Sequence, residues 1–299
     1  MAGAGDVGPA ADDPFTIVLG VAQDAGFPQA GCEKDCCREA WLDPSLRRYA
    51  VSLGIVDPST RQMWMLDCSP DFKFQLRDLQ RSVDPPLTKP LDGILLTHAH
   101  IGHYTGLVHI GREVIGADGV KLHVMPRMEK FLRTNGPWDQ LVSSNNVDLQ
   151  PLRSGTPVSL NERIQVMPFA VPHRDEYSET VGFRVSGPTR SVVYLPDIDK
   201  WSKWKTPIES VVADCDVAYL DGSFFGDGEI PGRNMSQIPH PFISESLERF
   251  GKLPENERGR VRFIHLNHTN PALQKESAER RLVTDAGMRI AEQGERVVL

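Results

Sequence analysis

The sequence lacks long hydrophobic runs and an excess of basic charge. Hydrophobic residues make up 40% of the 299 residues, but no apolar run approaches the roughly 20 residues that span a bilayer. The 33 Lys and Arg residues are outnumbered by 40 Asp and Glu residues, which gives a net charge of -7 and no basic face for a phosphate backbone. We therefore expect neither a membrane nor a nucleic acid as partner, but a small-molecule substrate.

Cysteine is also scarce, and it is unevenly placed. The five cysteines are an odd number for a disulfide framework, and three of them are Cys32, Cys36 and Cys37. In a reducing compartment such a cluster more often binds a metal than forms disulfides. The alternative is that Cys36 or Cys37 is a buried free thiol. Cys68 and Cys215 adjoin apolar strands and are expected to be inert core thiols.

The first residues are not expected to act as a targeting signal. Met1 to Pro14 are rich in Gly, Ala and Asp and contain neither a basic nor an apolar signal-peptide region. We expect a flexible N-terminal tail over residues 1–14, a cytoplasmic location by default, and one domain over residues 15–299, because no repeat or linker divides the remainder. The oligomeric state stays open, with a homodimer as one alternative.

Hydrophobic patterning predicts strands interrupted by helices in two halves, which favours two packed sheets flanked by helices. The runs over 49–56 and 62–67 flank a turn sequence and are expected to pair as a hairpin. Residues 22–37 are expected to form an ordered loop. The other predicted strands cover 15–21, 92–96, 121–125, 147–152, 163–171, 180–185, 191–195, 217–220, 262–265 and part of 288–298. The predicted helices cover 70–81, 104–114, 126–133, 206–212, 241–250 and 271–286.

One turn concentrates three of the nine histidines. His98, His100 and His103 lie in the sequence Thr-His-Ala-His-Ile-Gly-His, between the predicted strand over 92–96 and the predicted helix that follows. Side chains in a strand-to-helix turn can converge on one point, and imidazole is the commonest protein ligand for zinc-like ions. The turn therefore predicts a metal site.

Three further candidate ligands follow predicted strands. His173, Asp197 and His265 each stand where a strand gives way to a loop, which is where α/β folds assemble their sites. Taken singly, each residue has a structural alternative, a satisfied histidine or a helix-capping aspartate. Their joint occurrence with the histidine turn favours one shared metal centre.

In this order of residues the sequence resembles the metallo-β-lactamase superfamily, whose members carry His-x-His-x-Asp-His, then a lone His, an Asp and a final His. The resemblance implies an α/β fold, the αββα sandwich of two mixed sheets flanked by helices. It implies that the first metal is held by His98, His100 and His173, the second by His103 and His265, with Asp197 bridging the two. Asp67 matches the aspartate that supports the histidine turn in that superfamily.

Two subgroups resemble this chain in particular segments. Residues 20–29, 216–225 and 265–271 are similar to the pyrroloquinoline-quinone biosynthesis protein B (PqqB) family. The cysteine cluster, with a histidine three residues after the last metal ligand, resembles the phosphonate-pathway cyclic phosphodiesterase family. That resemblance implies an additional structural Zn²⁺ held by Cys32, Cys36, Cys37 and His268, although the Cys-x-x-x-Cys-Cys order departs from the Cys-x-Cys-x-x-Cys of that family.

Gly102 departs from the superfamily pattern, because it stands where an aspartate would bind the second metal. The remaining set of His103, His265 and Asp197 is a two-His-one-carboxylate arrangement, which is associated with non-haem iron when positions remain open. We expect a fully loaded first position and a labile second one. The expected ion is Zn²⁺, with Mn²⁺ or Fe²⁺ as alternatives.

The ligand set favours a hydrolase that uses a metal-bound hydroxide on an ester, lactone or phosphodiester. Asp197 is expected to orient that hydroxide, and His240 is a candidate proton donor at a rim shared with Asp221 and Ser223. A surface-loop histidine is the alternative for His240. The resemblance to the quinone-biosynthesis proteins implies a second function, an iron-dependent oxygenase, and Gly102 leaves a third, a non-catalytic metal-binding protein.

Overall fold

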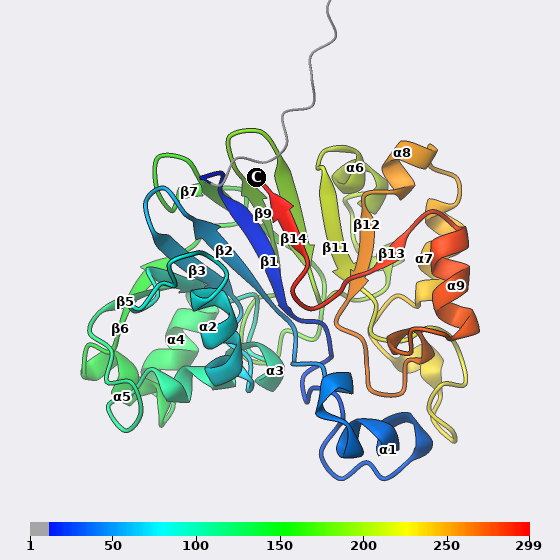
Figure 1. The fold of residues 1–299 in the computed structure, drawn as a ribbon, viewed down its shortest axis with the longest axis horizontal. Helices are drawn as coiled ribbons and strands as arrows, with labels where there is room; N and C mark the ends of the chain where they lie inside the picture. The colour runs from blue at the N-terminus through cyan, green and yellow to red at the C-terminus, as the bar shows by residue number, and fades with distance from the viewer. Residues whose placement is uncertain (1–11) are drawn as a thin grey trace, which may run out of the picture.

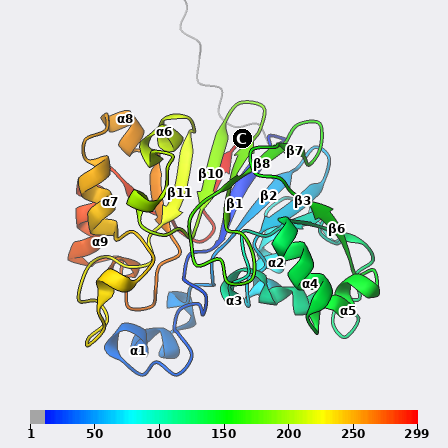
Figure 2. The same ribbon diagram turned by 180° about the vertical axis from the view of Figure 1, so that it is seen from behind.

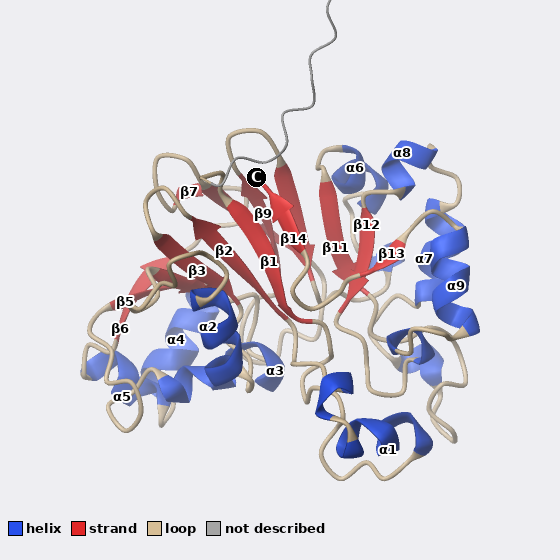
Figure 3. Cartoon of the chain, in the orientation of Figure 1, coloured by secondary structure: helices blue, strands red, loops and turns tan. Residues whose placement is uncertain are grey.

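The computed structural model describes residues 12–299 and shows two sheets packed face to face between two layers of helices (Figure 1). The tail predicted over residues 1–14 falls largely outside the described residues. Figure 3 shows the sheets side by side at the centre, with helices on both outer sides. This architecture confirms the predicted αββα sandwich.

Each sheet has seven strands and mixes parallel with antiparallel pairs. The 49–56 and 62–67 runs form the predicted antiparallel hairpin, as β2 (Ser52–Asp57) and β3 (Gln62–Leu66). The first sheet has the order β14 (Arg296–Val298), β1 (Phe15–Gly20), β2 (Ser52–Asp57), β3 (Gln62–Leu66), β4 (Gly93–Leu95), β5 (Val120–Val124) and β6 (Val147–Pro151). The second has the order β13 (Arg289–Ile290), β12 (Val261–Ile264), β11 (Val217–Asp221), β10 (Ser191–Leu195), β9 (Val181–Ser186), β8 (Gln165–Ala170) and β7 (Val158–Ser159).

Helices cover the outer face of each sheet, as the view from behind also shows (Figure 2). The first sheet carries α2 (Phe72–Gln80), α4 (Pro126–Thr134) and α5 (Trp138–Ser143), with the short α3 (Ile101–Tyr104) at its lower end. The second carries α6 (Ile208–Ala213), α7 (Ile243–Phe250), α8 (Glu255–Arg258) and α9 (Ala278–Asp285). The remaining helix, α1 (Asp35–Leu42), lies below both sheets.

Both faces of the central strands are buried, and the period of two assigns each side chain to a layer. In β10, Val192 and Tyr194 pack between the sheets, whereas Val193 and Leu195 pack against the outer helices. Full burial of such a side chain stabilises the fold by about 1.5–3 kcal/mol. The sheets are therefore rigid supports for the loops at their ends.

The structure differs from the predicted helices in two places. The helix predicted over 104–114 is wrong, because α3 ends at Tyr104 and a 3₁₀ turn over Thr105–His109 follows. Gly106 lies there so close to the Ser69 carbonyl that no side chain would fit. The helix predicted over 271–286 is two elements, a 3₁₀ turn over Pro271–Leu273 and α9. Ser277 begins α9 anew, since its side chain accepts a hydrogen bond from the Arg280 amide.

Three helices were not predicted. Within the 22–37 segment, expected to be a loop, α1 begins at Asp35. The other two are α5, which follows α4 after a short turn, and α8. All three are short, so the apolar period has little length in which to show itself. No helix among residues 12–299 is both long enough and apolar enough to cross a membrane.

Candidate metal centre

All six side chains predicted to hold the catalytic metals meet at one end of the sheets. The histidine turn follows β4 and leads into α3, while the other three residues follow β8, β10 and β12. The turn lies on the first sheet and the later residues on the second, so the centre spans both sheets. The six residues are His98, His100, His103, His173, Asp197 and His265.

The first position has four donor atoms around one point. Asp197 Oδ2 lies 3.2 Å from His98 Nε2, 3.2 Å from His173 Nε2 and 3.7 Å from His100 Nδ1. The His173 Nε2 and His100 Nδ1 atoms are 3.3 Å apart. Ligands of a tetrahedral zinc ion at about 2.0–2.2 Å would lie about 3.3–3.6 Å from one another. The observed spacing therefore fits a single zinc-like ion.

In two of these imidazoles, the ring nitrogen that faces away from Asp197 has a polar partner, which orients the ring. His98 Nδ1 lies 2.9 Å from the Thr97 hydroxyl, which leaves His98 Nε2 to face the cluster. His100 Nε2 lies 2.9 Å from Glu176 Oε2, so His100 presents Nδ1 instead. Outer partners of this kind fix the tautomer and orientation of a metal-bound histidine.

The second position is formed by His103, His265 and an aspartate that the sequence analysis did not assign, Asp24. The Asp24 Oδ1 atom lies 3.5 Å from His103 Nε2 and 3.9 Å from His265 Nε2. Asp197 Oδ2 lies 3.9 Å from His103 Nε2, between the two positions. His103 Nδ1 is held by Asp67 and His265 Nδ1 by the Ser223 hydroxyl, each at 2.8 Å.

Asp67 is a fully buried support of the histidine turn, as its match to the superfamily implies. Its carboxylate accepts hydrogen bonds from the Thr97 amide and hydroxyl, from Tyr194 and from His103. Asp67 and His265 have φ angles of 63° and 65°, in the left-handed region. A residue other than glycine is strained there, and such strain clusters at functional sites.

The donor atoms that face the centre are buried and poorly satisfied by the protein itself. Within residues 12–299, four of them have no hydrogen-bond partner. Buried polar atoms are almost always paired, because an unpaired one costs about 1–3 kcal/mol. Cations at the two positions would satisfy all four, so the residues present fit a metal. The atoms are Asp24 Oδ1, His98 Nε2, His103 Nε2 and His265 Nε2.

Burial and neighbouring charges shift the ionisation of these ligands. Burial, together with the adjacent His103, holds the pKa of His98 well below its ordinary value, so its imidazole is neutral. Burial alone would raise the pKa of Asp197, but the surrounding His173, His240 and His265 hold it well below its usual range. Neutral imidazoles and an ionised carboxylate are the forms that bind metals.

His240 lies beside the centre and is buried, with 5% of its surface exposed, so it is not a surface-loop histidine. Its Nδ1 atom is 2.8 Å from Asp221 Oδ2 and 3.1 Å from Asp197 Oδ1. Burial lowers the pKa of His240, but the carboxylates of Asp221 and Asp197 outweigh this effect and raise it to about 10. Asp221 also accepts hydrogen bonds from the Ser223 amide and hydroxyl.

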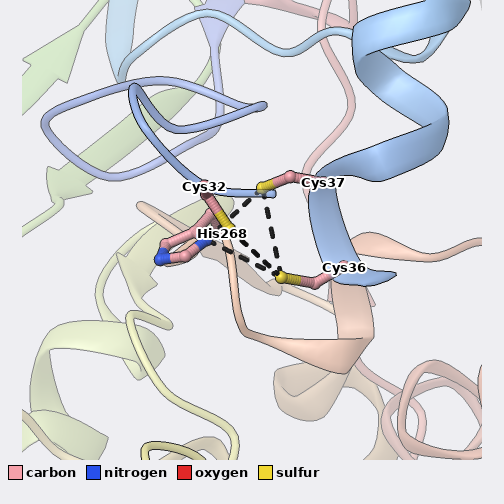
Figure 4. Close-up of side chains that lie close together, drawn as sticks. All are labelled: Cys32, Cys36, Cys37 and His268. Carbon is pink, nitrogen blue, oxygen red and sulfur yellow. Dashed lines mark hydrogen bonds between the residues drawn. The ribbon is translucent and has the colours of Figure 1, made fainter. Parts of the chain in front are cut away.

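A second cluster of donors lies at the start of α1 (Figure 4). Cys36 Sγ is 3.8 Å from Cys32 Sγ, 4.0 Å from Cys37 Sγ and 3.8 Å from His268 Nδ1. The Cys37 Sγ and His268 Nδ1 atoms are 3.4 Å apart. Sulfur ligands at about 2.3 Å from a tetrahedral zinc lie about 3.8 Å apart. The structure thus brings together the four residues that the sequence analysis grouped, and their spacing fits zinc.

A cavity of about 260 Å³ adjoins the metal centre. Asp24 and His240 line it, and two basic side chains, Arg174 and Arg233, face the same space. A larger cavity of about 590 Å³ lies near Tyr49 and contains none of the candidate ligands. The smaller cavity is therefore the one that reaches the chemistry.

Sequence reasoning missed Asp24 and Glu176. Asp24 stands a few residues beyond β1, so the strand-end rule that found Asp197 could also have found it. Glu176 lies in the loop after β8, three residues beyond His173, and only the fold of that loop brings it to His100. No spacing pattern in the sequence marks such a contact.

The comparisons with known proteins agree with this geometry. Residues 64–266, more than half of the chain, match the family described as the beta-lactamase superfamily domain. The chain therefore belongs to the metallo-β-lactamase superfamily.

Individual relatives resemble the chain over nearly its whole length. Coenzyme PQQ synthesis protein B of Xanthomonas campestris pv. campestris is 27% identical, over 93% of this chain and 97% of that protein. Zn²⁺-bound PqqB from Methylobacterium extorquens superposes with a TM-score of 0.79 at 21% identity, over 95% of this chain and all of the other. A diphosphatase of the PhnP family gives 0.67 at 21% identity, over 95% and 96% of the two chains. At these identities the structural likeness shows a shared fold.

Proposed function

We propose that this protein is a metal-dependent hydrolase that cleaves an ester, lactone or phosphodiester bond in a small molecule. The observation that carries the proposal is the convergence of three imidazole nitrogens on Asp197 Oδ2, at 3.2, 3.2 and 3.7 Å. Three histidines and a carboxylate beside an open cavity suit a catalytic site better than a closed structural one.

His98, His100, His173 and Asp197 would hold a divalent cation, which would supply a bound water with a pKa of about 7 and would polarise the bond to be cleaved. The chain supplies the rest. Thr97 and Glu176 fix the ring orientations of His98 and His100, and in this proposal Asp197 accepts a hydrogen bond that orients the attacking oxygen. His240 lines the cavity and is held at Nδ1 by two carboxylates. In this proposal its other ring nitrogen donates a proton to the leaving group.

The lining of the adjoining cavity favours an anionic substrate. Arg174 and Arg233 both face it, and guanidinium groups bind phosphate and carboxylate groups through paired hydrogen bonds. A phosphodiester carries its negative charge at the bond that is cleaved, whereas a lactone carries none. Among the bond types above, the two arginines favour the phosphodiester.

The test is turnover of a chromogenic phosphodiester and of a lactone panel by protein loaded with Zn²⁺ or Mn²⁺. We expect the phosphodiester to be hydrolysed, and His98→Ala to abolish turnover while its circular dichroism spectrum stays native. Equal activity in the His98→Ala variant would contradict the proposal. No turnover of any substrate with any metal would favour the non-catalytic alternative.

A second candidate function is an iron-dependent oxygenase in quinone cofactor biosynthesis. Two observations favour it: the likeness to Coenzyme PQQ synthesis protein B and the set of Asp24, His103 and His265, two imidazoles and a carboxylate as in non-haem iron sites. Substrate-dependent oxygen consumption by the Fe²⁺-loaded protein would support this function. Hydrolysis with Zn²⁺ and no oxygen uptake would exclude it.

We also propose that Cys32, Cys36, Cys37 and His268 bind a structural Zn²⁺. The contacts among their sulfur and nitrogen atoms, at 3.4–4.0 Å, have the spacing of ligands of one tetrahedral zinc ion. Four donors at tetrahedral spacing leave no open position for a substrate.

For its surroundings, we propose a small-molecule partner and no nucleic acid, since the net charge is -7. The five free thiols suit a reducing compartment such as the cytoplasm. A homodimer stays a prediction, and light scattering of the purified protein would test it.

A further inference from the structure

The position opposite Gly102 is filled by another residue of the chain. A Cβ atom added at Gly102 would collide with the Oδ1 and Cα atoms of Asp24 and would lie 2.8 Å from its Cβ. A side chain at residue 102 therefore cannot coexist with the present position of Asp24, backbone included. Here the carboxylate is at residue 24, on the loop after β1.

The Asp24 carboxylate lies near two imidazole nitrogens that have no hydrogen-bond partner among the described residues. Its Oδ1 atom lies 3.5 Å from His103 Nε2 and 3.9 Å from His265 Nε2. Across the described part of the chain, none of these three atoms has a hydrogen-bond partner, and both imidazoles are fully buried. The separations are too long for hydrogen bonds and close to those between two ligands of one dication.

The loop that carries Asp24 is fixed to the segment that carries His265. The Gln23 amide donates to the Leu266 carbonyl at 2.8 Å, and the Leu266 amide donates to the Val21 carbonyl at 2.9 Å. These bonds lie just before Asp24 on one segment and just after His265 on the other. The carboxylate is thus held in place by backbone pairing and does not sample the surface freely.

We propose that Asp24 is the carboxylate ligand of the second metal ion and replaces the side chain that Gly102 cannot supply. The second position then has two imidazoles, Asp24 and the shared Asp197, in place of the three ligands expected from the sequence. The second ion is accordingly held as a stable part of the centre. This inference rests on metal binding by the proposed hydrolase, but not on the reaction that it catalyses.

The experiment counts zinc ions. The protein and its variants are dialysed against buffered Zn²⁺, and bound zinc is measured by mass spectrometry. We expect three ions per wild-type chain, one in the cysteine cluster and two in the His/Asp centre. Asp24→Ala should lose one, with the affinity of that ion falling more than about 100-fold, beyond the 10–100-fold typical of outer-shell changes. His103→Ala should lose the same ion.

Gly102→Ala tests the same idea without removing any ligand. Alanine is a better helix former than glycine, yet its methyl group would displace Asp24, so we expect the second ion to be lost here too. Gln23→Ala, the neighbour on the same loop, is the matched control and should keep all three ions. Asp24→Asn preserves the side-chain volume and replaces Asp24→Ala if that variant does not fold.

A second readout does not depend on counting. In the Mn²⁺-loaded protein, two adjacent ions give a spin-coupled electron paramagnetic resonance spectrum, which Asp24→Ala or Asp24→Asn should convert to that of isolated Mn²⁺. Unchanged zinc content and unchanged coupling in a folded Asp24 variant would overturn the inference. Two coupled ions without any hydrolysis would instead contradict the proposed function and leave this inference intact.

Discussion

The two donor clusters of this protein differ in the way expected of a structural metal site and a catalytic one. The cysteine cluster takes its four donors from two chain segments, residues 32–37 and His268. The His/Asp centre draws its donors from loops of both sheets, and other side chains hold several of its ligands in turn. Four protein ligands that fill a zinc coordination sphere, as in the cysteine cluster, can only fix a loop. A metal centre whose ligands are oriented by other side chains and which adjoins a cavity, as in the His/Asp centre, can also bind a substrate.

The two clusters also share their chain segments. His265 and His268 are three residues apart, and Asp24 precedes Cys32 on the loop that leads to α1. Zinc in the cysteine cluster would therefore fasten the Asp24 loop to the His265 segment. The same two segments thus contribute to a structural site and to a catalytic one, and the following predictions test this difference.

The largest effect is expected from Asp197→Ala, because Asp197 contacts both metal positions. Loss of the shared ligand should lower kcat/KM at least about 10³-fold, roughly 4 kcal/mol, and remove zinc from the His/Asp centre alone. Asp199→Ala is the matched control, since Asp199 lies on the same loop and pairs with Lys203. Activity within tenfold of wild type in Asp197→Ala would contradict the assignment.

Cys37→Ser should remove the zinc ion of the other cluster and lower the free energy of unfolding by about 3–4 kcal/mol, because a tightly bound ion stabilises only the folded chain. Denaturant unfolding and zinc content measure both effects. Cys215→Ser, at a buried thiol outside the cluster, should leave the zinc content unchanged. If Cys37→Ser also keeps its zinc, the cysteines are free thiols.

His123 is a buried histidine outside both clusters, and it should respond to acid. Burial, with a contribution from Lys121, lowers its pKa to about 4. The unfolded state binds the proton first, near pH 6.5, so stability is lost as the pH falls from about 6.5 to about 4, by up to about 3 kcal/mol. Denaturation across this range, with His123→Gln as reference, should show the loss in wild type only. Parallel curves would contradict it.

Asp67→Asn should weaken metal binding about 10–100-fold, roughly 1.4–2.7 kcal/mol, because the amide cannot accept all the hydrogen bonds that orient His103 and the Thr97 turn. Competition with a chromophoric chelator measures the affinity. Asp57→Asn is the control, since Asp57 is equally buried but pairs with Arg163. Equal losses of affinity in the two variants would mean that the effect is general destabilisation.

Glu176→Gln should have the smallest effect. Glu176 orients His100, but its side chain is 46% exposed, so water can take over part of its role. We expect kcat/KM to fall by less than about tenfold, with zinc content unchanged. A metal affinity weakened as much as in Asp67→Asn would show that the exposure of a supporting carboxylate does not determine how strongly it affects metal binding.

The sequence was sufficient to predict a metal ligand where a histidine or aspartate stands at the end of a clearly patterned strand. His98, His173, Asp197 and His265 follow strands whose apolar patterns are clear, so both the sandwich and their meeting point could be predicted. The strand-end rule could have listed Asp24 as a candidate, but its place opposite Gly102 depends on a contact between residues far apart along the chain.

The remaining differences arise from local structure that tertiary contacts decide. The helix predicted after the histidine turn ends early, because the Gly106 amide donates to the Cys68 carbonyl and the His103 carbonyl accepts from the Cys68 amide, outside the helix. The orientation of His100 depends on Glu176 in a separate loop. Neither contact leaves a periodic signal in the sequence.

The most direct test is anomalous X-ray diffraction at the zinc edge, from crystals grown with Zn²⁺. The account predicts one peak within the cysteine cluster and two peaks about 3.5–4 Å apart in the His/Asp centre, as in other two-metal sites. Absence of any peak among His98, His100, His173 and Asp197 would contradict the account.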